Sequence, residues 1–212
     1  MGGLMGFSAG PIKRRVFFSF HYQNDIWRVN QVRNSWRYQK ESTREAEGFF
    51  DGSLWERSQR TGADSLKTLI REGMSNTSVT CVLVGAQTHE RRWVRYEIAR
   101  SIVKSNGILS VNIHGLKNRD GYTSAAGVNP LDCMGLYLVP DGKILLAEKK
   151  NGRWVRYEDY MQAVTLPRGW RQPTSTTPIP LSAYTRNYCY INDRGYENFS
   201  SWVRHAAEKT GC

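Results

Sequence analysis

The apolar segment VTCVLVG, residues 79–85, constrains the fold more than any other part of the chain. Its side chains are apolar or small at both odd and even positions, so a strand formed here must be covered on both faces. Residues 16–20 (VFFSF) and 108–113 have the same character. Such strands are typical of a parallel sheet with helices on both sides.

Helical patterns lie between these strands. Asp25 is placed to cap a helix containing Ile26, Val29 and Val32, and residues 63–74 and 91–104 show amphipathic spacing. Residues 39–48 read as a loop, and residues 49–55 (FFDGSLW) as a weak second strand. Alternation of strands and helices up to residue 115 predicts right-handed βαβ units, and hence an α/β core.

The pattern changes after residue 115. Residues 143–157 predict a β-hairpin around Asn151-Gly152, residues 167–180 contain four prolines, and residues 198–208 suit a closing helix. We therefore expect three parts. Residues 1–12 form a flexible leader, 13–115 an α/β core, and 116–212 a C-terminal extension that contains a β-hairpin and packs on the core.

The net charge of the chain restricts the classes of ligand that it can bind. The 212 residues include 30 Lys and Arg against 19 Asp and Glu, a net charge of +11, which suits nucleic acid, an anionic membrane or a phosphorylated ligand. The chain has no aromatic–basic motif of the kind that stacks on bases, so nucleic acid is disfavoured. The longest uncharged stretch, residues 74–89, is too polar to span a bilayer.

The four cysteines, at 81, 133, 189 and 212, are far apart and lack metal-ligand spacing. Together with the absence of a secretory pattern at the N-terminus, they predict a cytoplasmic protein with no bound metal. The chain also lacks GxGxxG, P-loop, GxSxG and HExxH motifs. This excludes an ordinary Rossmann dinucleotide site, a P-loop NTPase, an α/β-hydrolase elbow and a zincin.

Ligands of open α/β sheets bind beyond the carboxyl ends of the strands. Trp93 and Glu97 lie four residues apart near the start of the helix that follows residues 79–85, and therefore share one face. A carboxylate beside an indole suits a ligand in which a planar ring is bonded to a sugar carbon. This carbon becomes cationic when the bond breaks, as when nicotinamide leaves NAD. The same spacing also fits a packed tryptophan and a surface glutamate.

The other candidate residues are His21, Ser19, Asp51 and Trp55. His21, at a strand end, is either an acid–base group or a hydrogen-bonded structural histidine. Ser19 lacks a nearby base, which argues against a nucleophile. Asp51 and Trp55 suit either a pocket wall or a helix cap and a core anchor.

The hexamer RWVRYE occurs twice, at 92–97 and 153–158. Its first copy follows a predicted strand and leads into a helical pattern, whereas the second follows the Asn151-Gly152 turn. No similarity flanks the copies, so we treat the repeat as chance. We therefore assign Glu158 no role by analogy with Glu97.

Several of these segments resemble those of a known protein family. Residues 16–20 resemble the first strand of TIR domains, and residues 84–98 resemble their third strand and the following W-x-x-x-E helix. From Arg14 onward the chain is similar to the TIR-like proteins of the bacterial Thoeris anti-phage system. The stretches that carry this likeness are VFFSFHYQNDIWRVNQVRN, FDGSLWE, NTSVTCVLVG, RRWVRYEI, NPLD and YENFSSW.

The resemblance implies a flavodoxin-like TIR fold, with a central parallel sheet flanked by helices, that responds to phage infection. It implies an enzyme that cleaves NAD to nicotinamide and a cyclic ADP-ribose isomer, a second messenger that activates a separate Thoeris effector. NAD is then the substrate, no cofactor is needed, a phage component is the trigger, and homo-oligomers are possible. The alternative is a non-catalytic TIR adaptor that acts by protein–protein assembly.

The resemblance also assigns residues. Glu97 would be the catalytic carboxylate and Trp93 a neighbouring aromatic wall. Three residues would meet the nucleotide after the first strand: Ser19, Phe20 and His21. Asp51 and Trp55 would bind substrate from the loop after the second strand. Val94 replaces the cysteine that commonly follows the tryptophan.

Overall fold

The computed structural model describes residues 14–38, 44–46 and 62–212. Its main sheet has five parallel strands in the order β2-β1-β3-β4-β9. Their bounds are β1 (Arg14–Ser19), β2 (Arg44–Ala46), β3 (Val79–Val84), β4 (Gly107–Asn112) and β9 (Arg186–Cys189). This is the flavodoxin-like order, which confirms the predicted fold class.

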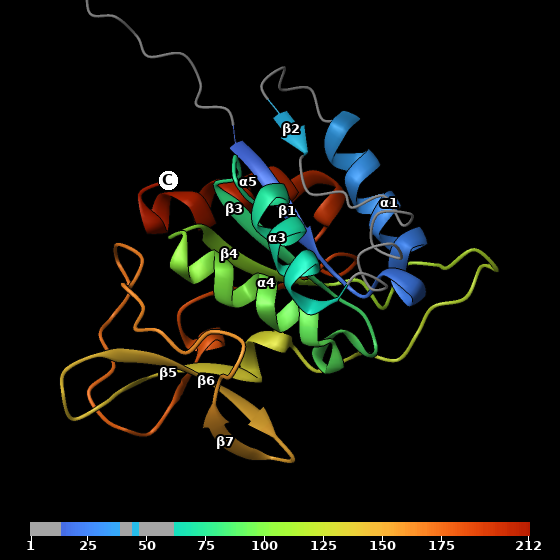
Figure 1. Cartoon of the computed structure of the whole chain (residues 1–212). Helices are drawn as coiled ribbons and strands as arrows, with labels where there is room; N and C mark the ends of the chain where they lie inside the picture. The colour runs from blue at the N-terminus through green and yellow to red at the C-terminus, as the bar shows by residue number, and fades with distance from the viewer. Residues whose placement is uncertain (1–13, 39–43, 47–61) are drawn as a thin grey trace, which may run out of the picture.

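Helices cover both faces of this sheet (Figure 1). Helices α1 (Tyr22–Tyr38) and α5 (Gly195–Thr210) pack on one face, and α3 (Ala63–Gly73) and α4 (Arg92–Val103) on the other. All six residues of β3 are buried, as its uninterrupted apolar run predicted. Within the described ranges, no helix is long and apolar enough to cross a membrane.

A second, antiparallel sheet has the order β7-β6-β5-β8. Its strands are β5 (Met134–Leu138), β6 (Ile144–Lys150), β7 (Arg153–Arg156) and β8 (Ile179–Pro180), and short 3-10 helices cover Thr88–Glu90, Pro130–Asp132 and Leu181–Ala183. Asn151 and Gly152 both have positive φ, 51° and 76°, as a tight turn requires. The predicted hairpin is confirmed, and the two RWVRYE copies begin a helix and a strand respectively.

The antiparallel sheet shares a hydrophobic core with the outer side of α4 (Figure 1). Leu136, Leu146 and Tyr157 pack there against Val94 and Ile98, and all five side chains are buried. Helix α4 is therefore enclosed between two sheets. Its position is fixed from both sides.

Residues after 115 also complete the parallel sheet. Strand β9 pairs with β4, and α5 packs over β1, β3 and β4 through Phe199, Trp202 and Val203. The parallel sheet thus takes strands from both sides of the predicted boundary at 115. The division into core and extension stays a prediction.

Two local expectations were wrong. Helix α1 begins at Tyr22, and Asp25 is not its cap: the Asp25 N–H already donates to the His21 carbonyl (3.0 Å), and its buried carboxylate pairs with Arg28 (3.1 Å). Arg44–Ala46 forms a strand where a loop was expected, because a short polar edge strand carries no hydrophobic pattern. The strand expected at 49–55 lies outside the described residues.

A substitution at Gly107 tests how closely α5 packs against β4. A Cβ at this position would overlap the carbonyl oxygen of Ala206 in α5, so we expect Gly107→Ala to lower the free energy of unfolding by about 3 kcal/mol. The control is Gly142→Ala, where φ is +80° and nothing lies within 4 Å, with an expected loss of about 1 kcal/mol from backbone strain alone. Equal losses in urea unfolding of the two variants would contradict the close contact.

Candidate active site

A pocket opens at the carboxyl edge of the parallel sheet, between β1 and β3, where the strand order reverses direction. This switch point is the usual ligand position in doubly wound sheets. Two chain segments form its walls: residues 20–23 follow β1, and residues 90–94 with Glu97 belong to the start of α4 and the turn before it. The pocket has a volume of ≈ 210 Å³.

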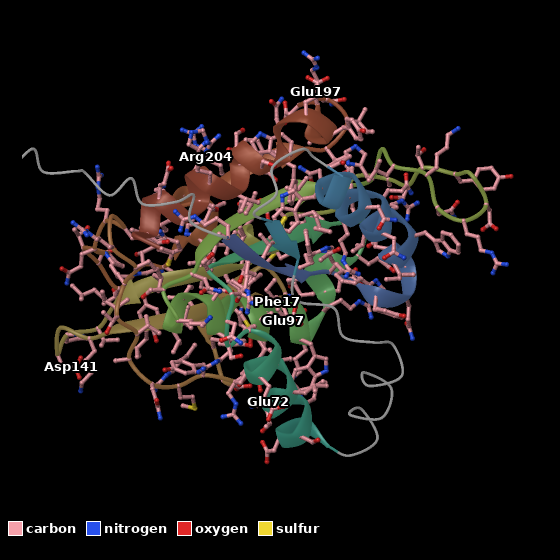
Figure 2. All side chains as sticks on the ribbon, turned by 90° about the horizontal axis from the view of Figure 1, so that it is seen from above. Phe17, Glu72, Glu97, Asp141, Glu197 and Arg204 are labelled. Atoms are coloured by element: carbon pink, nitrogen blue, oxygen red, sulfur yellow. The ribbon has the colours of Figure 1, made fainter. Side chains whose placement is uncertain are left out.

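Glu97 lines this pocket from the protein interior. Its side chain points from the second turn of α4 toward β1, where the Ser19 hydroxyl donates a hydrogen bond to Oε2 (2.5 Å). The residue is 6% exposed. Figure 2 shows it in the middle of the molecule, whereas Glu72, Asp141 and Glu197 lie at the periphery. Glu97 is therefore not the surface glutamate that its spacing also allowed.

Burial sets the protonation of this carboxyl. Loss of solvation raises the pKa of Glu97 to about 8, and the Ser19 hydrogen bond acts in the opposite direction because it favours the charged form. The carboxyl of the free protein is thus mostly protonated at pH 7. A nearby positive charge would shift it to the ionised form.

Trp93 stands one helical turn before Glu97 and forms an aromatic wall of the pocket. Its ring meets Tyr96 edge to face, with centroids 6.2 Å apart and an interplanar angle of 87°. The Arg92 guanidinium lies over the Trp93 ring, 4.9 Å from the ring centroid. The indole is half-buried, so part of it is open to a ligand.

His21 lies across from α4, directly after β1. It is 6% exposed, and its Nδ1 has no hydrogen-bond partner within the parts of the chain that the structure describes. Burial lowers the pKa of the imidazole, and Arg91 lowers it further against the opposing effect of Glu90. The neutral ring presents a free hydrogen-bonding nitrogen, an arrangement that a bound ligand can satisfy.

The structure brings most of the predicted residues together. Phe20, His21, Trp93 and Glu97 line the pocket, and Ser19 lies behind it in contact with Glu97. Asp51 and Trp55 lie outside the described residues. Among residues 14–38, 44–46 and 62–212, no three His, Cys, Asp or Glu side chains are grouped to hold a metal.

Sequence reasoning missed the remaining lining residues, which are Tyr22, Gln23, Glu90, Arg91, Arg92 and Val94. No motif marks them. Most of them were signalled only by adjacency to His21 or Trp93. Arg91 and Arg92 also stand in a basic run, whose charges suit either solvent or a contact to a pyrophosphate. The arrangement as a whole combines a buried carboxyl, an aromatic face and basic side chains at one mouth.

The raised pKa has a consequence for stability. Unfolded chains ionise Glu97 near its ordinary value of 4.5, whereas the folded protein keeps the proton to about 8, so wild-type stability falls as pH rises between these values. Glu97→Gln removes this titration. We expect the stability of the variant relative to wild type to increase by on the order of 2–4 kcal/mol from pH 5 to pH 8 in urea unfolding.

The matched control for that measurement is Glu72→Gln, which removes one charge from the exposed side of α3. Any pH effect shared by the two variants reports net charge alone. Parallel pH–stability curves for wild type and Glu97→Gln would contradict the buried, protonated carboxyl.

Comparison with known proteins identifies the family. The family model for the TIR-like domain of the Thoeris protein ThsB matches residues 17–118. A relative named "Putative cyclic ADP-D-ribose synthase ThsB1", from Bacillus cereus (strain MSX-D12), is 45% identical over 195 residues, which cover 90% of this chain and 98% of that protein. The matched domain contains the strands and the helix that form the pocket. The chain therefore belongs to the ThsB family of TIR-like Thoeris proteins.

Proposed function

We propose that this protein is an anti-phage enzyme that cleaves NAD, releases nicotinamide and makes a cyclic ADP-ribose isomer. The buried Glu97 carboxyl, held by Ser19 beside the Trp93 wall, is the observation that carries the proposal. The name of the similar ThsB1, a cyclic ADP-D-ribose synthase, supports the same reaction. NAD is the substrate, and the reaction needs no further cofactor.

The reaction breaks the bond between the nicotinamide nitrogen and the anomeric carbon of its ribose. The electron pair of this bond goes to the pyridinium ring, so nicotinamide leaves neutral and positive charge develops on the ribose. Ionised Glu97 stabilises that charge, which resembles the oxocarbenium ion of glycoside cleavage. Another nucleophilic atom of the same ADP-ribose then attacks the anomeric carbon, which closes the ring.

The pocket is suited to one end of the dinucleotide. Its volume of ≈ 210 Å³ is below the roughly 300–1,000 Å³ of complete small-molecule sites. The nicotinamide ribose therefore occupies it, with the ring against Trp93. Phe20 and His21 contact the sugar from the β1 side, and Arg91 at the mouth faces the pyrophosphate. Cyclisation in place of hydrolysis requires that these walls exclude water from the anomeric carbon.

Substrate binding itself ionises the catalytic group in this proposal. The nicotinamide ring of NAD carries a positive charge, and a cation beside a carboxyl lowers its pKa. Glu97 gives up its proton as NAD enters and is charged when the bond breaks. A carboxyl that is neutral when the pocket is empty costs less to bury than a permanent charge would.

The proposal extends to the partners. The enzyme acts in the cytoplasm, is triggered by a phage component, assembles as a homo-oligomer, and reaches a Thoeris effector through the diffusible cyclic nucleotide. Neither a membrane nor nucleic acid takes part. The net charge of +11 supports an anionic, pyrophosphate-bearing ligand.

The direct test uses purified protein incubated with NAD, with and without lysate of phage-infected cells, followed by nucleotide chromatography and mass spectrometry. Wild type is expected to release nicotinamide and a cyclic product. Glu97→Gln is expected to lose at least about 100-fold in rate, because it removes the stabilising charge. Glu72→Gln, at an exposed position of α3, a helix that contributes no residue to the pocket wall, keeps wild-type activity.

Formation of the cyclic product by a folded Glu97→Gln variant at the wild-type rate would refute the catalytic role. A non-catalytic TIR adaptor predicts that wild type releases no nicotinamide under any triggering condition. The two outcomes are distinguished in one chromatogram.

The pH profile tests the role of Ser19. Because the ionised carboxyl is the active form, kcat/KM is expected to rise with pH and level off above about 8, the pKa of Glu97 in the free protein. Ser19→Ala removes a hydrogen bond that favours the charged form, so its inflection is expected at higher pH. A profile whose inflection is the same in both proteins would contradict this role.

A further inference from the structure

One carboxylate outside the pocket holds two cations. Asp159 accepts hydrogen bonds from Arg92 at both oxygens, from Nε (2.8 Å) and Nη2 (2.6 Å), and it also pairs with Lys67 Nζ (2.9 Å). Arg92 is in α4 and Lys67 in α3, whereas Asp159 follows β7. The two-pronged contact to Arg92 fixes the direction of the guanidinium as well as its distance.

Both cations lie over aromatic rings of α4. Arg92 is 4.9 Å from the centroid of Trp93, and Lys67 Nζ is 5.5 Å from that of Tyr96. Trp93 and Tyr96 themselves meet edge to face. A single carboxylate thus supports both rings of this pair through one cation–π contact each.

Asp159 is held firmly in its place. Tyr157, two residues earlier, is 1% exposed in the core between α4 and the antiparallel sheet, and its N–H donates to the Leu146 carbonyl (2.9 Å). The Asp159 side chain is only 12% exposed, and the Arg92 hydrogen bonds hold its pKa at about 2. The carboxylate is therefore charged at all physiological pH values.

Arg92 has no comparable support of its own. Its side chain is 57% exposed, so packing does not fix its rotamer, and it lines the same pocket as Trp93. Without Asp159 the guanidinium is free to leave the indole face or to turn across the pocket mouth.

We propose that Asp159 is a positioning residue of the active site, which orients Arg92 over Trp93 and thereby holds the aromatic wall that receives the nicotinamide ring. The inference rests on the proposed function. It gives a role in the reaction to a residue outside the matched TIR-like segment 17–118. Asp159 touches no substrate and acts only through Arg92 and Lys67.

Kinetics of Asp159→Asn provide the first test. A looser wall weakens stacking in the ground state and the transition state alike, so we expect KM for NAD to rise about 10-fold with kcat changed less than about twofold. Asp159→Glu is expected to recover part of the loss. In a Trp93→Ala background, Asp159→Asn is expected to add nothing further, since the ring through which it acts is gone.

The control is Glu158→Gln, which removes the same charge from the neighbouring residue. The Glu158 side chain is 76% exposed and forms an ion pair with Lys150 (3.0 Å). It is expected to keep wild-type KM. A loss of kcat in Asp159→Asn with unchanged KM, or equal effects of the two substitutions, would overturn the proposal.

A second readout does not depend on turnover. The seven tryptophans give seven indole N–H signals in a ¹H–¹⁵N spectrum, and Trp93→Phe identifies that of Trp93. Asp159→Asn is expected to shift or broaden this signal, and Glu158→Gln to leave it in place. An unmoved Trp93 signal in Asp159→Asn would overturn the inference even if NAD cleavage is confirmed. Absence of NAD cleavage in wild type, with a moved signal, would instead refute the proposed function and leave Asp159 as the support of the ring.

Discussion

The hydrogen bond between Ser19 and Glu97 joins the two elements on which the site depends. It connects the last residue of β1 to the second turn of α4, across the sheet face on which α4 packs. Its geometry requires that β1 and β3 be parallel neighbours and that the chain return from β3 directly into α4. Val94 and Ile98 seat the helix in the core, and Glu97 faces β1 between them. A buried carboxyl with one hydroxyl partner costs stability, which supports our proposal that Glu97 serves the reaction.

The C-terminal half supports this arrangement from two directions. Strand β9 and helix α5 extend the parallel sheet and cover the face opposite to α4. The antiparallel sheet packs on the outer side of α4. Asp159, which follows its strand β7, binds the cations that lie over the Trp93–Tyr96 pair. Residues after 115, to which the sequence assigned no function, therefore complete the fold and, in our proposal, hold one wall of the pocket.

Sequence patterns predicted the interior elements well, because a strand buried on both faces must be apolar throughout, as in residues 79–84. They failed at the sheet edges, where Arg44–Ala46 and Arg186–Cys189 are short and polar. Helical spacing, which is local, predicted that Trp93 and Glu97 share one face, and the resemblance to TIR domains supplied the roles expected of them. Asp159 was beyond prediction, because its contacts to Arg92 and Lys67 span 67 and 92 positions of sequence and leave no local pattern.

In our proposal, Glu97 is a neutral buried carboxyl that NAD converts to its charged form. Titration of its side-chain carboxyl by ¹³C NMR, with the signal assigned by its absence in Glu97→Gln, measures this directly. We expect a pKa of about 8 in the free protein and a clearly lower value with NAD bound, since the cationic ring favours the carboxylate. An ordinary carboxyl value in the free protein, or one that NAD does not change, would contradict it.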